Sequence, residues 1–267
     1  MHFNRQKLPN KKKLKIRPSN KIEHIPRVKR HRRKITDKQR YKNVEITKRN
    51  KINKYKTLNE WEGCLKGHPA FILGNAPSIS DEKLSILDPY FTIGINRIFY
   101  IYDPTILLWQ DKEVFIRDHK KIMKQKSIKV CRDISDTRNM FINFKLIMGK
   151  FKLGKDLYKL YGQGNTGALA VQMAILLGCS CVVLIGMDCK YGDRGKTDFY
   201  GKNKDHKWYT LKMCYAAMKW IKSRCPIPVY NCSDIDLWER RKLKNVVKEI
   251  NPYLLNRDYF LDIFGRR

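Results

Sequence analysis

The sequence contains no apolar run long enough to cross a membrane as a helix. A spanning helix needs roughly 18 to 20 consecutive apolar residues, and the best run, 168–185, is interrupted by Gln172, Gly178 and Ser180. The first residues also lack the apolar segment of a secretory signal. We therefore expect a cytoplasmic protein without a transmembrane segment.

Metal-ligand patterns of cysteine are missing as well. The eight cysteines form no CxxC pair and show no zinc-type spacing with the six histidines. Cys131, Cys179 and Cys181 stand in apolar runs, where a free cysteine behaves as a small hydrophobic residue. We expect reduced thiols and no structural zinc site.

Acidic residues are scarce, and the imbalance is uneven. The chain has 25 Asp and Glu against 57 Lys and Arg, a net charge of +32. Residues 1–57 hold 22 basic and 3 acidic residues, which gives +19, and the remaining 210 residues carry +13. Residues 1–57 also lack apolar periodicity apart from a short helix signal at 37–46, so we expect a disordered basic arm.

An arm of this charge will bind polyanions, because neutralising phosphates releases counterions. The sequence predicts DNA or RNA as a partner of residues 1–57, without a folded reading module for either. Two alternatives stay open: an anionic membrane surface, and a tail that only aids solubility. No pattern indicates an oligomeric state.

From residue 58 onward, strand and helix signals alternate, which is typical of a mostly parallel α/β sheet with helices on both faces. The change of pattern at residue 58 predicts one domain at 58–267. Expected strands lie at 70–74, 91–95, 105–109, 127–131, 181–185 and 228–231; expected helices lie at 80–87, 168–177, 204–224 and 234–250. We interpret the basic stretch 133–160 as a lid or a substrate-facing insertion.

The polar residues that follow these strands are the candidate site. In an open parallel sheet, ligands bind beyond the carboxyl ends of the strands. The residues in question are Gly74 to Ser78, Asn96 with Arg97, Gln110 with Asp111, and Gly186 to Asp188. The turn 164–167 opens a helix, whose N-terminus offers free N–H groups to an anion. Each feature is also an ordinary turn or helix cap, so their shared edge is what favours a site.

These motifs resemble two related families. The segments GNAPSI at 74–79, FTIGINR at 91–97, TGALAVQMAILLG at 166–178 and VLIGMD at 183–188 are similar to the MptE-like (hydroxymethylpterin diphosphokinase-like) group. More distantly, they resemble the bacterial sialyltransferases of glycosyltransferase family 42. The resemblance covers 68–232 and implies a Rossmann-like fold that binds a nucleotide.

The resemblance also implies roles for individual residues. It implies an inverting glycosyltransferase with a nucleotide-sugar donor, a histidine general base at His206, and Asp188 as a second catalytic residue. The implied donor contacts are Gly74, Asn75, Pro77, Ser78, Asn96, Thr166, Gly167 and Gly186. The sialyltransferases need no metal, whereas the acidic Asp111 favours Mg²⁺-assisted diphosphate chemistry or a different donor.

Two classes of function therefore stay open. One is an enzyme, either the glycosyltransferase or a magnesium-dependent diphosphokinase of the MptE type. The other is a nucleic-acid-binding accessory protein that keeps a nucleotide-binding fold without catalysis. The presence of Asn96, Asp188 and His206 favours the enzyme. On the residues alone, His206 is one of six histidines, and its charged neighbours Lys204, Asp205 and Lys207 are typical of a solvent-exposed helix start.

Overall fold

A computed structural model describes residues 58–133, 141–149, 152–162, 164–203 and 207–250. By contacts the chain divides into two units, 1–43 and 44–267, and all described residues belong to the second. The predicted arm, its expected helix at 37–46 and the candidate base His206 lie outside the described residues.

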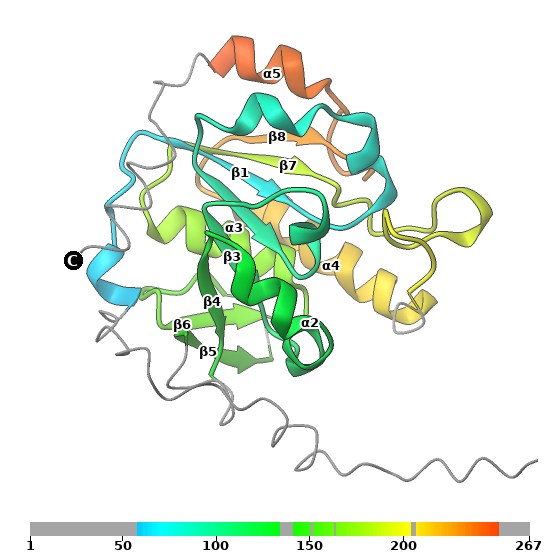
Figure 1. Ribbon diagram of the computed structural model, residues 1–267. Helices are drawn as coiled ribbons and strands as arrows, with labels where there is room; N and C mark the ends of the chain where they lie inside the picture. Colours follow the sequence, from blue (N-terminus) through cyan, green and yellow to red (C-terminus); the bar gives the residue numbers. More distant parts are fainter. Residues whose placement is uncertain (1–57, 134–140, 150–151, 163, 204–206, 251–267) are drawn as a thin grey trace, which may run out of the picture. The chain divides into compact units, whose positions relative to one another are not determined.

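The domain is built on one eight-stranded sheet in which every pairing is parallel (Figure 1). The strand order is β6-β5-β4-β3-β2-β1-β7-β8. The strands are β1 (Pro69–Leu73), β2 (Thr92–Ile95), β3 (Ile106–Trp109), β4 (Ile128–Arg132), β5 (Ile142–Met148), β6 (Lys159–Gly162), β7 (Cys181–Ile185) and β8 (Val229–Cys232). This confirms the predicted α/β class with a parallel sheet.

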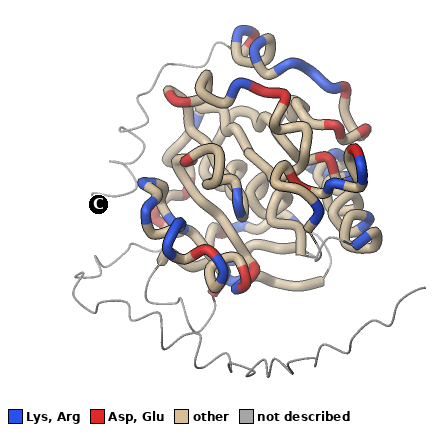
Figure 2. Tube along the Cα trace, turned by 45° about the vertical axis from the view of Figure 1, so that its right-hand side comes forward, with Lys and Arg blue, Asp and Glu red and all other residues tan. Residues whose placement is uncertain are grey.

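The central strands are buried on both faces, as parallel strands covered by helices are. All residues of β1, β2, β3 and β7 are buried, and none of these strands carries a charged residue. Figure 2 accordingly shows charged residues mainly on the outer loops and helices. Because side chains alternate along a strand, Ile72 and Leu184 enter one core, and Phe71 and Val183 enter the other.

Helices cover both faces of the sheet. The helices α3 (Thr166–Leu176) and α4 (Trp208–Arg224) pack into the core that contains Ile72. The helices α2 (Lys112–Lys124) and α5 (Leu243–Ile250) pack into the core that contains Phe71. Among the described residues, no helix is long and apolar enough to span a membrane.

The chain reverses direction across the sheet next to β1. Strands β1 to β6 follow one another to one side, and α3 then carries the chain back so that β7 pairs with the other edge of β1. A crevice forms at such a switch point beyond the carboxyl ends of the strands, where the two chain directions diverge. The expected ligand site therefore lies at the carboxyl ends of β1, β2 and β7.

Three expectations about secondary structure were wrong. The stretch 133–160 contains strand β5 and leads into β6, so at least those residues belong to the sheet and are not an insertion. The expected helix at 80–87 is instead two short 3-10 helices, Pro77–Asp81 and Leu84–Leu87, with Ser80 inside the first. The last described helix begins only at Leu243, because 231–240 is held by bonds to the Asn231 side chain and by a bridge to Arg240.

Candidate functional site

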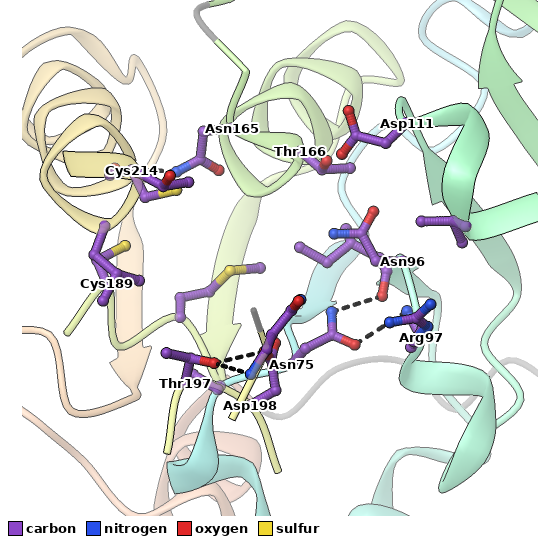
Figure 3. A pocket seen from close by; sticks show the side chains of 18 of the residues that line it. Asn75, Asn96, Arg97, Asp111, Asn165, Thr166, Cys189, Thr197, Asp198 and Cys214 are labelled. Carbon is purple, nitrogen blue, oxygen red and sulfur yellow. Dashed lines mark hydrogen bonds between the residues drawn. The ribbon is translucent and has the colours of Figure 1, made fainter. Parts of the chain in front are cut away.

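A cavity of about 540 Å³ opens at the carboxyl edge of the sheet, within the size range of small-molecule sites. All four predicted polar clusters contribute to it, together with the turn that opens α3. The lining includes Asn75, Asn96, Arg97, Gln110, Asp111, Asn165, Thr166, Gly186, Asp188, Asp198, Tyr200 and Cys214. The structure thus brings together segments that are more than 100 residues apart (Figure 3).

Asn75 ties the end of β1 to the end of β2. Its amide nitrogen donates to the carbonyl oxygen of Ile95 at 2.9 Å, and its amide oxygen accepts from the backbone N–H of Arg97 at 3.0 Å. The residue is 7% exposed. Both ends of the amide therefore hold the turn that contains Asn96.

Asn96, within that turn, has an unusual backbone conformation and an unpaired side-chain oxygen. Its φ is 49°, in the left-handed region that few residues other than glycine adopt. Its side-chain oxygen Oδ1 is buried and has no hydrogen-bond partner within the described part of the chain. A buried acceptor without a partner costs about 1 to 3 kcal/mol, so a ligand that donates a hydrogen bond there would recover this cost.

The loop after β1 is joined to the end of β7 by its backbone. The N–H of Gly74 donates to Ile185 at 2.7 Å, and the N–H of Ala76 donates to Gly186 at 3.0 Å. A Cβ added at Gly74 would lie 2.1 Å from the carbonyl oxygen of Gly186, so only glycine allows this approach. Gly74 and the following loop thus serve first to join two strands.

Asp188 accepts hydrogen bonds from two loops. Its carboxylate accepts from the backbone N–H of Ser78 at 3.1 Å, from the Ser78 hydroxyl, and from the N–H of Asp234 at 3.0 Å. Both Asp188 and Ser78 are 3% exposed. The N–H of Ser78 is therefore engaged by a carboxylate. Pro77 begins the 3-10 helix and, like Ser78, does not line the cavity.

The N-terminus of α3 faces the cavity. Asn165 is its N-cap, since the side-chain oxygen accepts from the N–H of Ala168 at 3.0 Å, and its amide nitrogen donates to the carbonyl of Cys214. The N–H groups of Thr166 and Gly167 have no acceptor among the described residues. The positive end of the helix dipole and the N–H group of Thr166, which lines the cavity, make this part of the wall chemically suited to an anion.

A basic and aromatic cluster forms another wall. Arg97 Nε donates to Asp118 at 2.7 Å, and the guanidinium lies 5.7 Å from the ring centroid of Tyr200. Burial would lower the pKa of Arg97, but its hydrogen bonds to Asp118 and Tyr200 outweigh burial and raise it. Burial, followed by the nearby charge of Asp198, raises the pKa of Tyr200 to about 12. At neutral pH this side of the cavity is therefore lined by the cationic guanidinium of Arg97 and the neutral phenol of Tyr200.

Two cysteines line the cavity near the start of α4. Burial raises the pKa of Cys214 to about 11, and burial also raises the pKa of Cys189 well above its usual value. All eight cysteines are free. Because the thiolate is the reactive form, Cys189 and Cys214 are protonated wall residues at neutral pH.

Asp111 lines the cavity together with Glu113, two residues further along the chain. It precedes α2 as the N-cap and makes no capping bond through its side chain. No group of three His, Cys, Asp or Glu residues in the described ranges is arranged to hold a metal ion. Mg²⁺ is commonly bound through only one or two carboxylates together with substrate phosphates, so a metal role of Asp111 stays a prediction.

Two lining residues, Arg117 and Glu113, were not predicted from the sequence; both come from α2. Asp198 and Tyr200 also line the cavity. They come from the segment 191–201 after β7, whose polar, glycine-rich composition indicates either a cover over a ligand or a plain surface loop. It is fixed by the N–H of Phe199, which donates to the carbonyl of Asn75 at 2.7 Å.

No family model matches the chain, and no curated protein matches it in sequence. Solved glycosyltransferases are similar in structure at low identity. The MAf glycosyltransferase from Magnetospirillum magneticum AMB-1 has a TM-score of 0.49 and 16% identity over 80% of this chain. This chain covers only 42% of that protein's length.

Two sialyltransferases from Campylobacter jejuni are also similar. CstII, solved with cytidine-5′-monophosphate, has a TM-score of 0.37 and 13% identity over 62% of this chain and 80% of its own. Cst-I has a TM-score of 0.39 and 13% identity over 71% of this chain and 80% of its own. The structural similarity therefore includes sialyltransferases, and nothing in it bears on the MptE-like group.

Proposed function

We propose that the domain is a nucleotide-dependent transferase, most specifically a glycosyltransferase whose nucleotide-sugar donor binds in the cavity. The observation that carries this proposal is the unpartnered Oδ1 of Asn96, which lines the same cavity as Thr166, the first residue of α3, whose N–H group has no acceptor among the described residues. A ligand that satisfies both needs a hydroxyl or amino donor and an anionic group. A nucleotide has both, in its ribose or base and in its phosphate.

The chemistry proposed is an inverting displacement. The acceptor hydroxyl loses its proton to His206 and attacks the anomeric carbon of the sugar. The bond from that carbon to the phosphate oxygen breaks, and the nucleotide phosphate leaves with the electron pair. The α3 N-terminus stabilises the negative charge that grows on the leaving phosphate. The residues Asn203 and Thr210, on either side of His206 in the chain, both line the cavity, which supports this role.

Asp188, which the resemblance implies to be catalytic, is proposed to act by positioning. Its carboxylate accepts three hydrogen bonds from Ser78 and Asp234. These bonds fix the loops after β1 and β8 against the end of β7. We propose that Gly74, Asn75, Pro77 and Gly186, in the same loops, contribute to donor binding by setting the shape of the cavity wall.

Turnover of a donor panel tests the enzyme proposal. We expect the protein to release free nucleotide from at least one nucleotide sugar as the sugar is transferred to the acceptor or to water. Chromatography measures the released nucleotide. General base catalysis typically contributes about 100-fold to 10,000-fold in rate, so His206→Ala should lose turnover by that factor and keep donor affinity. The wild-type rate should fall at acidic pH, because a protonated imidazole cannot accept a proton.

The second candidate is a magnesium-dependent diphosphokinase, favoured by Asp111 on the cavity wall. Adding EDTA separates the two. The glycosyltransferase keeps its rate, whereas the diphosphokinase loses it and regains it with Mg²⁺. If neither nucleotide sugars nor nucleoside triphosphates are turned over although nucleotides bind, the accessory-protein alternative replaces both.

A further inference from the structure

Exposed aromatic side chains gather at one edge of the domain. All those in the described residues either follow the carboxyl end of β2 or β7 or begin α4: Tyr100, Tyr191, Tyr200, Trp208 and Tyr209. Met213, in the second turn of α4, is exposed as well. We call these six residues the aromatic edge. Apolar side chains that gather in this way mark an interaction site, whereas scattered single ones need no explanation.

The aromatic edge projects from the domain and lies largely outside the cavity. Figure 1 shows the segment after β7 and the start of α4 extending beyond the carboxyl ends of the strands. Trp208, Tyr209 and Met213 do not line the cavity. Tyr200 does line it and is 41% exposed, and its ring lies 6.3 Å from that of Tyr100. An occupant of the edge therefore lies outside the cavity and reaches it at Tyr200.

Positive charge predominates on the segments that carry the edge. The segments 190–202 and 207–224 contain nine basic residues, all of them exposed. They contain only two acidic residues, Asp193 and Asp198, and Asp198 is buried. Anionic lipid head groups attract clusters of Lys and Arg that lie close to them. The edge is therefore complementary in charge to an anionic surface.

Lysines lie directly beside two of the rings. Lys212 Nζ is 4.6 Å from the ring centroid of Trp208, and Lys207 Nζ is 6.0 Å from that of Tyr209. Trp and Tyr are enriched at membrane interfaces, where their rings lie at the level of the head groups, and nearby lysines can bind the lipid phosphates. Interfaces between proteins are instead depleted in lysine. This combination favours a lipid surface over a protein partner.

The angles between neighbouring rings favour lipid over nucleic acid. The rings of Tyr100 and Tyr200 are tilted by 51°, and those of Trp208 and Tyr209 by 82°. A protein that binds a single strand stacks successive bases on its aromatic faces, which neighbouring rings do best when they are close to parallel. Rings that enter a layer of head groups need no common plane.

We propose that the aromatic edge docks on the surface of a membrane that contains anionic phospholipid. The rings lie at the level of the lipid head groups, and the neighbouring lysines bind the lipid phosphates. This proposal goes beyond the proposed function and does not rest on it. Because the cavity opens at the same edge of the sheet, docking places the cavity next to the lipid surface.

Quenching of Trp208 fluorescence tests the docking on the full chain. Of the five tryptophans in the sequence, only Trp208 is exposed, and none lies in residues 1–57. Vesicles made of equal parts of phosphatidylglycerol and brominated phosphatidylcholine should quench the emission, because bromine quenches a tryptophan at close range. Trp208→Phe should lose most of this quenching. The control Trp220→Phe, which removes a half-buried tryptophan of the same helix, should keep it.

Two methionines of similar exposure test where the protein docks. Met213 is 47% exposed, and Met123 is 50% exposed at the end of α2, which leads away from the carboxyl edge of the sheet. Met213→Ala should bind the anionic vesicles roughly threefold to tenfold more weakly in a titration followed by Trp208 quenching, because less apolar surface enters the interface. Met123→Ala should bind as the wild type does.

The test separates docking of the edge from binding by residues 1–57. Vesicles of brominated phosphatidylcholine alone should quench Trp208 much less than the anionic vesicles. Sedimentation of the protein with anionic vesicles without quenching of Trp208 would assign the binding to residues 1–57 and overturn the proposal. Equal quenching by both kinds of vesicle, or equal affinity of Met213→Ala and Met123→Ala, would also overturn it.

Two further results keep the alternatives apart. If single-stranded oligo-dT changes the emission of Trp208 and anionic vesicles do not, nucleic acid is the occupant of the edge and the membrane proposal is wrong. No nucleotide sugar is present in these measurements. A protein without transferase activity would therefore contradict the proposed function and leave the vesicle result valid.

Discussion

At the scale of single residues, two asparagines that lie close together in the structure have different roles at the site. Asn75 bonds to Ile95 and to the backbone of Arg97, so its amide supports the turn. Asn96, in the middle of that turn, keeps a buried side-chain oxygen without a partner among the described residues. One asparagine therefore supports the turn, and the other leaves a buried acceptor at the cavity wall.

Replacing Asn75 should damage both stability and binding. Asn75→Leu leaves the carbonyl of Ile95 and the N–H of Arg97 without partners, which costs about 1 to 3 kcal/mol for each buried group. We expect a lower melting temperature and a near loss of nucleotide binding, because the Asn96 turn loses its support. Asn143→Leu is the control: Asn143 bonds to Cys131 away from the cavity, and this variant should lose stability without losing affinity. Wild-type nucleotide affinity in folded Asn75→Leu would contradict this role.

The sequence predicted which residues lie at the carboxyl edge of the sheet, but it did not predict the hydrogen bonds that each of them makes. Position after a strand predicted that Asn75, Asn96 and Asp188 would gather, because carboxyl ends of parallel strands share an edge. Their partners could not be predicted from the sequence. The bond from Ser78 to Asp188 joins residues 110 positions apart. No local pattern indicates whether Asn75 or Asn96 will bond to the backbone of a distant strand.

At the scale of secondary-structure elements, the junction of β1 and β7 shapes the site. The two strands pair along their full length, from Pro69 with Cys181 to Leu73 with Ile185. The loops beyond them continue the contact through the N–H groups of Gly74 and Ala76. The cavity wall is therefore an extension of the sheet, and its geometry depends on how closely the two loops approach.

A methyl group at Gly74 should separate these loops. In Gly74→Ala the added Cβ would meet the Gly186 carbonyl oxygen at 2.1 Å, and a backbone atom cannot swing away as a side chain can. Overpacking of this kind costs about 1 to 3 kcal/mol, measured as a lower denaturant midpoint. In the control, Gly162→Ala, the added Cβ meets the flexible end of Leu169 at 3.0 Å. A larger loss in the control than in Gly74→Ala would show that the junction tolerates expansion.

The elements that sequence patterns missed lie away from the centre of the sheet. Cys181 to Ile185 is fully buried, and its apolar run predicted β7 with its observed bounds. Strand β5 alternates buried and open positions and contains Asn143 and Lys145, and β6 at the sheet edge begins with the exposed Lys159. Polar residues on partly open strands weaken the apolar signal, which is why 133–160 was interpreted as an insertion.

At the scale of the whole molecule, the charge separates the chain into two parts. Residues 1–57 carry +19 and the other 210 residues carry +13. The described domain has its own two hydrophobic cores, built from 58–133, 141–149, 152–162, 164–203 and 207–250. We expect these cores to account for the stability of the protein and residues 1–57 to account for binding to polyanions.

Deleting residues 1–57 tests this division. The melting temperature should stay nearly unchanged, because a segment of this composition adds little to a core. Salt-sensitive binding to DNA and RNA should largely disappear, since it depends on released counterions. The deletion should leave nucleotide affinity intact. A large drop in melting temperature would place part of residues 1–57 in the folded domain.

The most direct measurement of the central claim is nucleotide binding to wild type and Asn96→Gly by calorimetry. Glycine keeps the left-handed backbone, with φ of 49° at this position, and removes the side chain that carries the unpartnered Oδ1. We expect a nucleoside monophosphate or diphosphate to bind the wild type, and Asn96→Gly to bind it roughly 5-fold to 100-fold more weakly at a similar melting temperature. Arg194→Gly, at a position with φ of 55° that does not line the cavity, should bind as the wild type does. Equal affinity in wild type and Asn96→Gly, or no binding of any nucleotide to the wild type, would contradict a nucleotide site at the junction of β1, β2 and β7.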